Sequence, residues 1–138
     1  MNWLLCSAVL GFLGVATGAF GAHGLRSMFA DLEPTEAARQ IETFKTAARY
    51  ALVHAVVLLG ISILSSLQPS SKLQFAGWAF FLGTIIFSGT LWVLVLTGQK
   101  WLGAITPIGG TIIIIGWFTL GVEAVTHKQT PVAEAASE

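Results

Sequence analysis

Charged side chains are scarce in this sequence. Only 10% of its 138 residues are Asp, Glu, Lys or Arg, whereas 54% are hydrophobic. A soluble domain carries roughly 25% charged residues, so this chain has too little charge to cover a surface that faces water. The 7 basic and 7 acidic residues also cancel to a net charge of zero, which removes the electrostatic basis for binding nucleic acid. The shortage of charge therefore indicates a membrane protein.

The sequence also has a single cysteine and none of the common catalytic motifs. Cys6 is the single cysteine and lies in an apolar run, so it forms no internal disulfide and says nothing about redox compartment. The sequence contains no nucleophile–base pair, no phosphate-binding loop and no paired carboxylates. We therefore predict that the protein is not an enzyme, with no catalytic residue, cofactor or bound metal.

Four long apolar runs are present instead. A helix needs about 20 mainly apolar residues to cross a bilayer, because lipid offers no partners to backbone N–H and C=O groups. Four stretches satisfy this requirement, at about residues 3–22, 47–67, 75–96 and 105–125. The first has no basic leading segment, so we expect a retained helix rather than a signal peptide. The sequence predicts an all-α integral membrane four-helix bundle that forms one domain over residues 1–138.

The polar connector 23–46 separates the first two spans. Beyond Pro34, apolar residues recur at helical spacing, namely Ala37, Ile41, Phe44 and Ala48. Such a stripe predicts an amphipathic helix at the membrane interface, with a water-exposed extension of the second span as the alternative. The segment 130–138 is small and polar, and we expect it to be disordered.

Small residues gather on the predicted spans. Helices in lipid associate through close contacts at glycine and serine, because burial of apolar surface gives little driving force there. The expected packing positions are Gly11, Gly14, Gly18, Gly21, Ser88, Gly89, Gly109, Gly110 and Gly116. Tight contact between helices is the main interpretation, and close approach of a ligand is the alternative.

Polar groups are expected to meet at one end of the bundle. Tyr50 and His54 are four residues apart on the second span, and His23 ends the first span on the same side. Thr106 and Pro107 open the fourth span on that side too. Ionisable residues within spans are costly, so this cluster of five residues is the candidate site.

Several interpretations of the cluster stay open. The imidazoles could lock helices together by hydrogen bonds, bind a small molecule, lipid or quinone, relay protons, or ligate haem as a pair. Zinc would need a third ligand that the sequence does not place nearby. Glu123 lies near the opposite end, four residues before His127, which favours a Glu–His pair on one helix face.

Five motifs occur in an order that resembles a known family: GAFGAH at 18–23, the Tyr50/His54 pair, FSGTLW at 87–92, TPIGG at 106–110 and GW at 116–117. The sequence is similar to bacterial YgdD-like proteins and eukaryotic transmembrane protein 256, small membrane proteins of uncharacterised function. The resemblance covers nearly the whole chain and implies a multi-pass protein of the bacterial inner membrane, with no established activity. It also implies cytoplasmic termini, whereas the basic residues of the connectors favour the opposite orientation.

The expected function is a non-enzymatic structural or accessory component of the membrane. We expect the protein to lie in the lipid bilayer and to associate with a second copy of itself or with a larger membrane complex. A ligand-binding or proton-handling protein built on His23, Tyr50 and His54 is the alternative, and a bis-histidine haem protein is a third.

Overall fold

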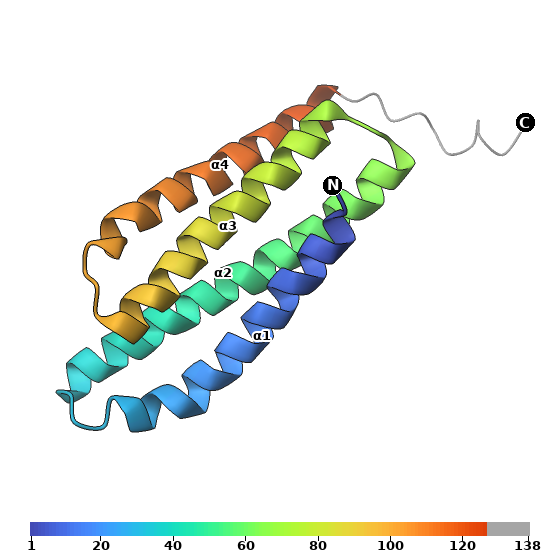
Figure 1. The fold of residues 1–138 in the computed structure, drawn as a ribbon. Coiled ribbons are helices and arrows are strands. Elements are labelled where there is room, and N and C mark those ends of the chain that lie inside the picture. Colours follow the sequence, from blue (N-terminus) through green and yellow to red (C-terminus); the bar gives the residue numbers. More distant parts are fainter. Residues whose placement is uncertain (127–138) are drawn as a thin grey trace, which may run out of the picture.

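The protein is a set of four long antiparallel helices. The computed structural model describes residues 1–126, which contain four α-helices and no strand. The helices are α1 (Trp3–Met28), α2 (Pro34–Leu67), α3 (Ser71–Thr97) and α4 (Leu102–Thr126), and they lie side by side in chain order (Figure 1). All four are long and apolar enough to cross a membrane. The predicted all-α membrane fold is therefore confirmed, while the segment 130–138 lies outside the described residues.

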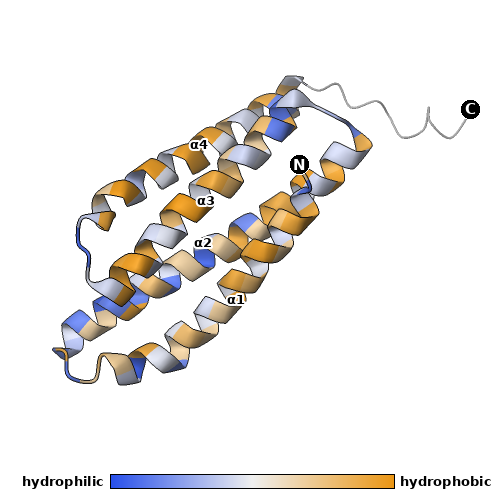
Figure 2. Cartoon of the chain, viewed as in Figure 1, coloured by the Kyte–Doolittle hydropathy of each residue, from blue (hydrophilic) through white to orange (hydrophobic). Residues whose placement is uncertain are grey.

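Apolar side chains cover the outside of the helices as well as the inside. In the view of Figure 2, hydrophobic residues lie along all four helices, and hydrophilic ones lie mainly near the helix ends and along α2. Phe12 on α1 and Phe118 on α4 are each 73% exposed. A water-soluble protein rarely exposes apolar surface so continuously, so these faces are the ones that contact lipid.

The amphipathic segment does not form a separate interfacial helix. Residues 34–46 are instead the first turns of α2, which begins with Pro34 and continues without a break. At about 1.5 Å per residue, its 34 residues reach about 50 Å, beyond the ~30 Å hydrocarbon core. The extension is possible because no proline follows Pro34 until Pro69, and because Phe44 is buried against Leu25 and Val95. The alternative of an extended second span therefore describes the structure.

Each helix packs mainly against its neighbours in the chain. Glycine residues at the contacts allow these helices to approach each other closely. A Cβ added at Gly14 would lie 2.7 Å from Cγ of Leu52, and one at Gly109 would lie 2.5 Å from the backbone nitrogen of Phe87. At this helix separation, neither position has room for a side chain. We call the α1–α2 and α3–α4 contacts around Gly14 and Gly109 the close-packed interfaces.

The other predicted packing positions fall into two groups. Those facing a neighbouring helix within the chain, with a neighbour within 4 Å of an added Cβ, are Gly11, Gly18, Gly21, Gly110 and Gly116. Ser88 is buried, and its hydroxyl donates to the backbone carbonyl of Ala47 on α2 at 2.9 Å. An added Cβ at Gly89 would meet nothing within 4 Å. Most of these positions therefore serve contacts inside this chain.

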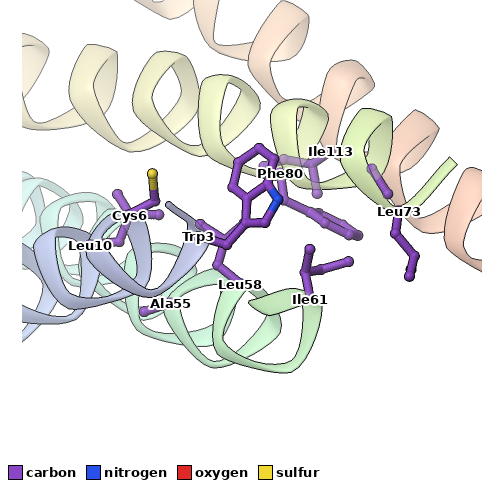
Figure 3. Close-up of a cluster of buried hydrophobic side chains, with 10 residues drawn as sticks. Trp3, Cys6, Leu10, Ala55, Leu58, Ile61, Leu73, Phe80 and Ile113 are labelled. Atoms are coloured by element: carbon purple, nitrogen blue, oxygen red, sulfur yellow. The ribbon is translucent and has the colours of Figure 1, made fainter. Parts of the chain in front are cut away.

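The largest buried cluster joins all four helices near the N-terminus of α1. Trp3 lies within it (Figure 3), 3% exposed, with its Nε1–H donating to Oε1 of Gln74 on α3 at 3.0 Å. Its indole ring covers Gly77, where an added Cβ would lie 2.7 Å away. Phe80 of α3 and Ile113 of α4 complete the cluster on the other side. This cluster fixes α3, and through it α4, relative to the α1–α2 pair.

Candidate functional site

A cavity of about 440 Å³ lies between α2, α3 and α4. We call it the aromatic cavity. Its lining residues are Arg49, Tyr50, Val53, His54, Phe87, Gly110, Ile113, Ile114 and Trp117. The size is within the range of about 300–1,000 Å³ that is usual for small-molecule sites, and a mainly apolar lining with a few polar groups is also usual for them.

Aromatic rings form the walls of this cavity. The ring of Tyr50 stacks on that of Phe87, with centroids 4.3 Å apart. The imidazole of His54 lies 5.7 Å from Phe80 and 6.4 Å from Trp117, by ring centroids. Gly110 has no side chain to fill the space beside Phe87, where an added Cβ would lie 3.7 Å from the ring. At this level rings lie between α2 and α4, while α3 and α4 stay in close contact at Gly109.

One nitrogen of His54 is fixed to its own helix. Nδ1 lies 2.8 Å from the backbone carbonyl oxygen of Tyr50. A carbonyl oxygen only accepts hydrogen bonds, so Nδ1 must carry the proton. The opposite edge of the ring, with Nε2, consequently points away from the α2 backbone.

The other nitrogen has no protein partner within residues 1–126. His54 is 3% exposed, and its Nε2 is buried without a hydrogen bond there. The charged group that lines the cavity is the cation Arg49, which pairs with Glu42 at 2.8 Å, and none of the described lining residues is acidic. An imidazolium would be costly in such surroundings. The ring is therefore neutral, and Nε2 presents an unused lone pair.

The structure brings together only part of the predicted cluster. Tyr50 and His54 share the cavity, whereas Thr106 and Pro107 lie about one turn before Gly110 and are not among its lining residues. The Thr106 hydroxyl is 3.0 Å from that of Thr90 and joins α3 to α4. Thr106 thus contributes to the α3–α4 contact beside the cavity, whereas Pro107 is exposed.

His23 lies apart from the cavity. It is exposed on α1, which continues six residues beyond the predicted end of the span, to Met28. Gly21 contacts Phe44 and Lys45 of α2, so His23 lies beside the polar extension of α2. His54 is about ten residues further along that helix, or roughly 15 Å. The two histidines therefore do not form a bis-histidine haem site.

Two aromatic residues of the cavity wall, Phe87 and Trp117, were not among the predicted site residues. The ring of Phe87 on α3 stacks on that of Tyr50, and the ring of Trp117 on α4 lies near His54. Both lie in motifs that carry the family resemblance, FSGTLW at 87–92 and GW at 116–117. Those motifs are the signal that could have identified them. Within residues 1–126, no three His, Cys, Asp or Glu residues lie close enough to hold a metal ion.

Glu123 belongs to the opposite end of the bundle. It is buried on α4, and its Oε2 lies 3.5 Å from Nζ of Lys72 at the start of α3. The same ammonium group donates to the Thr126 hydroxyl at 2.8 Å. His127, the predicted partner of Glu123, lies outside the described residues.

Comparisons with known proteins match this chain to a recognised family. Residues 17–110 match the family described as "Protein of unknown function (DUF423)". A UPF0382 membrane protein of Staphylococcus aureus (strain bovine RF122 / ET3-1) is 41% identical over 118 residues, which cover 86% of this chain and 90% of that protein. The UPF0382 membrane protein YwdK of Bacillus subtilis (strain 168) is 35% identical over 126 residues, covering 91% and 97%.

The comparison with solved structures gave no match. The relatives are named membrane proteins, in agreement with the four apolar helices. The matched region contains Tyr50, His54, Phe87 and Gly110. The narrower similarity to YgdD-like proteins and transmembrane protein 256 stays an expectation from the sequence motifs. Together the match over residues 17–110 and the two relatives show that this chain, a multi-pass bacterial membrane protein, belongs to the DUF423 family of unknown function.

Proposed function

We propose that the protein binds a membrane-soluble amphiphile in the aromatic cavity without transforming it chemically. The observation that carries this proposal is the cavity of about 440 Å³, whose lining joins aromatic rings to His54, a residue whose Nε2 has no hydrogen-bond partner within residues 1–126. Buried polar atoms in native proteins are nearly always hydrogen-bonded. A histidine that served only to lock helices together would be expected to use both ring nitrogens. The missing hydrogen bond therefore argues against a purely helix-locking role for His54.

The surroundings of the cavity support entry from the bilayer. Tyr50, Val53, Ile114 and Trp117 line it and are also exposed on the outer surface of the helices. Since this surface faces lipid, a ligand reaches the cavity laterally and leaves its apolar part among the acyl chains. Arg49 and Glu42 form an exposed pair at the end nearest the polar extension of α2.

The test is saturable binding of an aromatic amphiphile to the protein in lipid nanodiscs. Equilibrium dialysis of 1-naphthol, corrected with empty nanodiscs, should give saturable binding to the wild type. Gly110→Leu should abolish it, because the new side chain occupies the space beside Phe87. Gly121→Leu is the matched control on the same helix, since an added Cβ there meets nothing within 4 Å.

Two results would contradict the proposal. One is wild-type uptake that does not exceed partition into empty nanodiscs. The other is equal saturable binding by Gly110→Leu and Gly121→Leu, with circular dichroism showing that both variants keep their helices. Either result would mean that the cavity does not hold the probe.

A structural or accessory role is the second candidate. It is favoured by the arrangement of the helices, since α1 packs mainly on α2 and α4 mainly on α3. This leaves broad apolar faces, including Phe12 and Phe118, on which a second copy or a partner could pack. Four glycines of α1 do not support this role, because they face α2 of the same chain, namely Gly11, Gly14, Gly18 and Gly21. Purification in mild detergent with native sizing and mass spectrometry tests it, and a monomer without a stable partner would contradict it.

A further inference from the structure

We infer that a pocket beside the polar extension of α2 binds the phosphate-bearing headgroup of an anionic phospholipid. The pocket measures about 340 Å³ and lies between α2 and the end of α3 with the connection that follows it. We call it the basic pocket. Its lining residues are Arg39, Gln40, Thr43, Leu94, Gly98 and Lys100. It shares none of them with the aromatic cavity, so the inference goes beyond the proposed function.

Two cations from different parts of the chain meet in the basic pocket. Arg39 belongs to the first turns of α2, and Lys100 belongs to the connection between α3 and α4, at the same end of the molecule (Figure 1). None of the described lining residues is acidic. Arg39 is paired with Glu36 at 2.7 Å, whereas Lys100 has no carboxylate within salt-bridge distance in residues 1–126. The charge of Lys100 is therefore available to an anion.

Glu36 holds the donors of the basic pocket in place. Its carboxylate accepts hydrogen bonds from Nε of Arg39 at 3.0 Å and from Nε2 of Gln40 at 2.7 Å. A guanidinium has five N–H groups and an amide has two, so both side chains keep donors that Glu36 does not use. The hydrogen bonds of Arg39 and Gln40 lower the pKa of Glu36, and the charge of Lys100 adds to this shift, so Lys100 lies near the same carboxylate. A phosphate group suits such donors, because it offers negative charge and several acceptor oxygens.

The basic pocket lies at the depth of the lipid headgroups. No charged residue occurs between Lys72 and Lys100, so Lys100 is the first charged position beyond the apolar run of α3. Trp101 follows it directly and is 63% exposed. Tryptophan is enriched at the boundary between hydrocarbon and water, and basic pockets between helices at this boundary bind anionic headgroups. The position along the helices therefore favours a lipid headgroup as the occupant.

A neighbouring groove gives the acyl chains a path. It measures about 430 Å³, shares two residues with the basic pocket and adds Leu91, which lies about one turn before Leu94 on α3. The acidic residue in its lining, Glu42, is paired with Arg49 at 2.8 Å. The two leucines lead from the charged groups towards the hydrocarbon. A soluble phosphate ester would leave this apolar path unused, so the observations favour a phospholipid.

The experiment measures lipid binding to the delipidated protein in detergent micelles by native mass spectrometry. Anionic phosphatidylglycerol and zwitterionic phosphatidylcholine are titrated separately. The wild type should prefer phosphatidylglycerol by about fivefold, the usual size for one basic residue near an anionic headgroup. Lys100→Gln should reduce this preference to about one. Lys100→Arg keeps the charge and should retain the preference.

The matched control is Lys45→Gln, which removes one positive charge from the same part of α2. Lys45 lies on the side of α2 towards α1, where its Cγ would be 3.7 Å from a Cβ added at Gly21, and it does not line the basic pocket. This variant should keep the wild-type preference. Circular dichroism checks that each variant keeps its helices.

Three results would overturn the inference. The first is equal affinity of the wild type for the two lipids. The second is an equal loss of preference in Lys45→Gln and Lys100→Gln, which would mean that the charged end attracts anions without a defined site. The third is displacement of bound phosphatidylglycerol by millimolar glycerol 1-phosphate, which would assign the pocket to a soluble phosphate ester. Binding of 1-naphthol in the aromatic cavity is a separate measurement, so each proposal can fail without the other.

Discussion

The two faces of α2 differ in how they meet their neighbours. On the face towards α1, Ala48, Leu52 and Ala55 lie against the glycines of α1, and the Ser7 hydroxyl donates to the Ala55 carbonyl at 2.8 Å. On the other face, Tyr50 and His54 line a cavity of about 440 Å³, and Nε2 of His54 has no hydrogen-bond partner in the described part of the chain. Because α2 packs closely against α1, loose packing is not a general property of this helix. The open side is therefore a specific feature of the fold.

Removal of the largest side chain in the buried cluster should have the greatest effect. Trp3→Ala takes away a ring that is 3% exposed, together with its hydrogen bond to Gln74. We expect a loss of about 3–5 kcal/mol in the free energy of unfolding, as for large-to-small changes in cores. Unfolding in mixed micelles measures it. Trp101→Ala, at a site 63% exposed, should change the same quantity by less than about 0.5 kcal/mol.

Two adjacent glycines of α4 lie in different environments. Gly109 belongs to the close-packed α3–α4 interface, whereas Gly110 lines the aromatic cavity. Gly109→Ala places a Cβ 2.5 Å from the backbone nitrogen of Phe87, whereas Gly110→Ala places one 3.7 Å from the Phe87 ring. We expect the first to cost about 1–3 kcal/mol through overpacking. The second should be neutral or stabilising by up to about 1 kcal/mol, since alanine favours a helix. Thermal unfolding followed by circular dichroism measures both, and equal losses would mean that the two faces of α4 are packed alike.

Hydrogen bonds between helices should matter more than those within one helix. Ser88→Ala removes a buried bond from α3 to the Ala47 carbonyl of α2, and we expect a cost of about 1 kcal/mol. The matched change is Thr111→Ala, which removes a bond from an exposed residue to Pro107 of its own helix. Its effect should be smaller than about 0.5 kcal/mol. The same unfolding assay compares the two, and a larger loss for Thr111→Ala would contradict the assignment of Ser88 to a helix contact.

The smallest expected effect lies on the polar extension of α2, outside the membrane. The hydrogen bond from Arg39, with a further one from Gln40, lowers the pKa of Glu36 from its usual value of 4.5. A carboxylate with a lowered pKa stabilises the folded state above its unfolded pKa and loses this contribution as the pH falls through the folded pKa. Stability should therefore decline slightly below about pH 4.5 in the wild type. Glu36→Gln should remove that part of the decline in an acid titration, and an unchanged titration curve would contradict it.

The sequence predicts the helices well because lipid imposes a simple length requirement. It also predicts that Tyr50 and His54 lie together, since residues four apart share a helix face. It misplaces His23, because no residue between Ala22 and Met28 stops α1. It misses Phe87 and Trp117, because α3 and α4 are apolar on every side and give no periodic signal of which face turns inward. Their rotation depends on packing at Gly83 and Gly109, which only the folded chain reveals.

The aromatic cavity is lined by Val53 and Ile114, which are exposed to lipid. The affinity of a ligand that enters there should therefore be expressed relative to its concentration in the lipid. A molecule that arrives through acyl chains is present at its concentration per volume of lipid, which for an oily compound far exceeds its concentration in water. Modest attraction at the site then suffices for high occupancy. Dose–response curves for this protein should therefore scale with the amount of lipid in the sample.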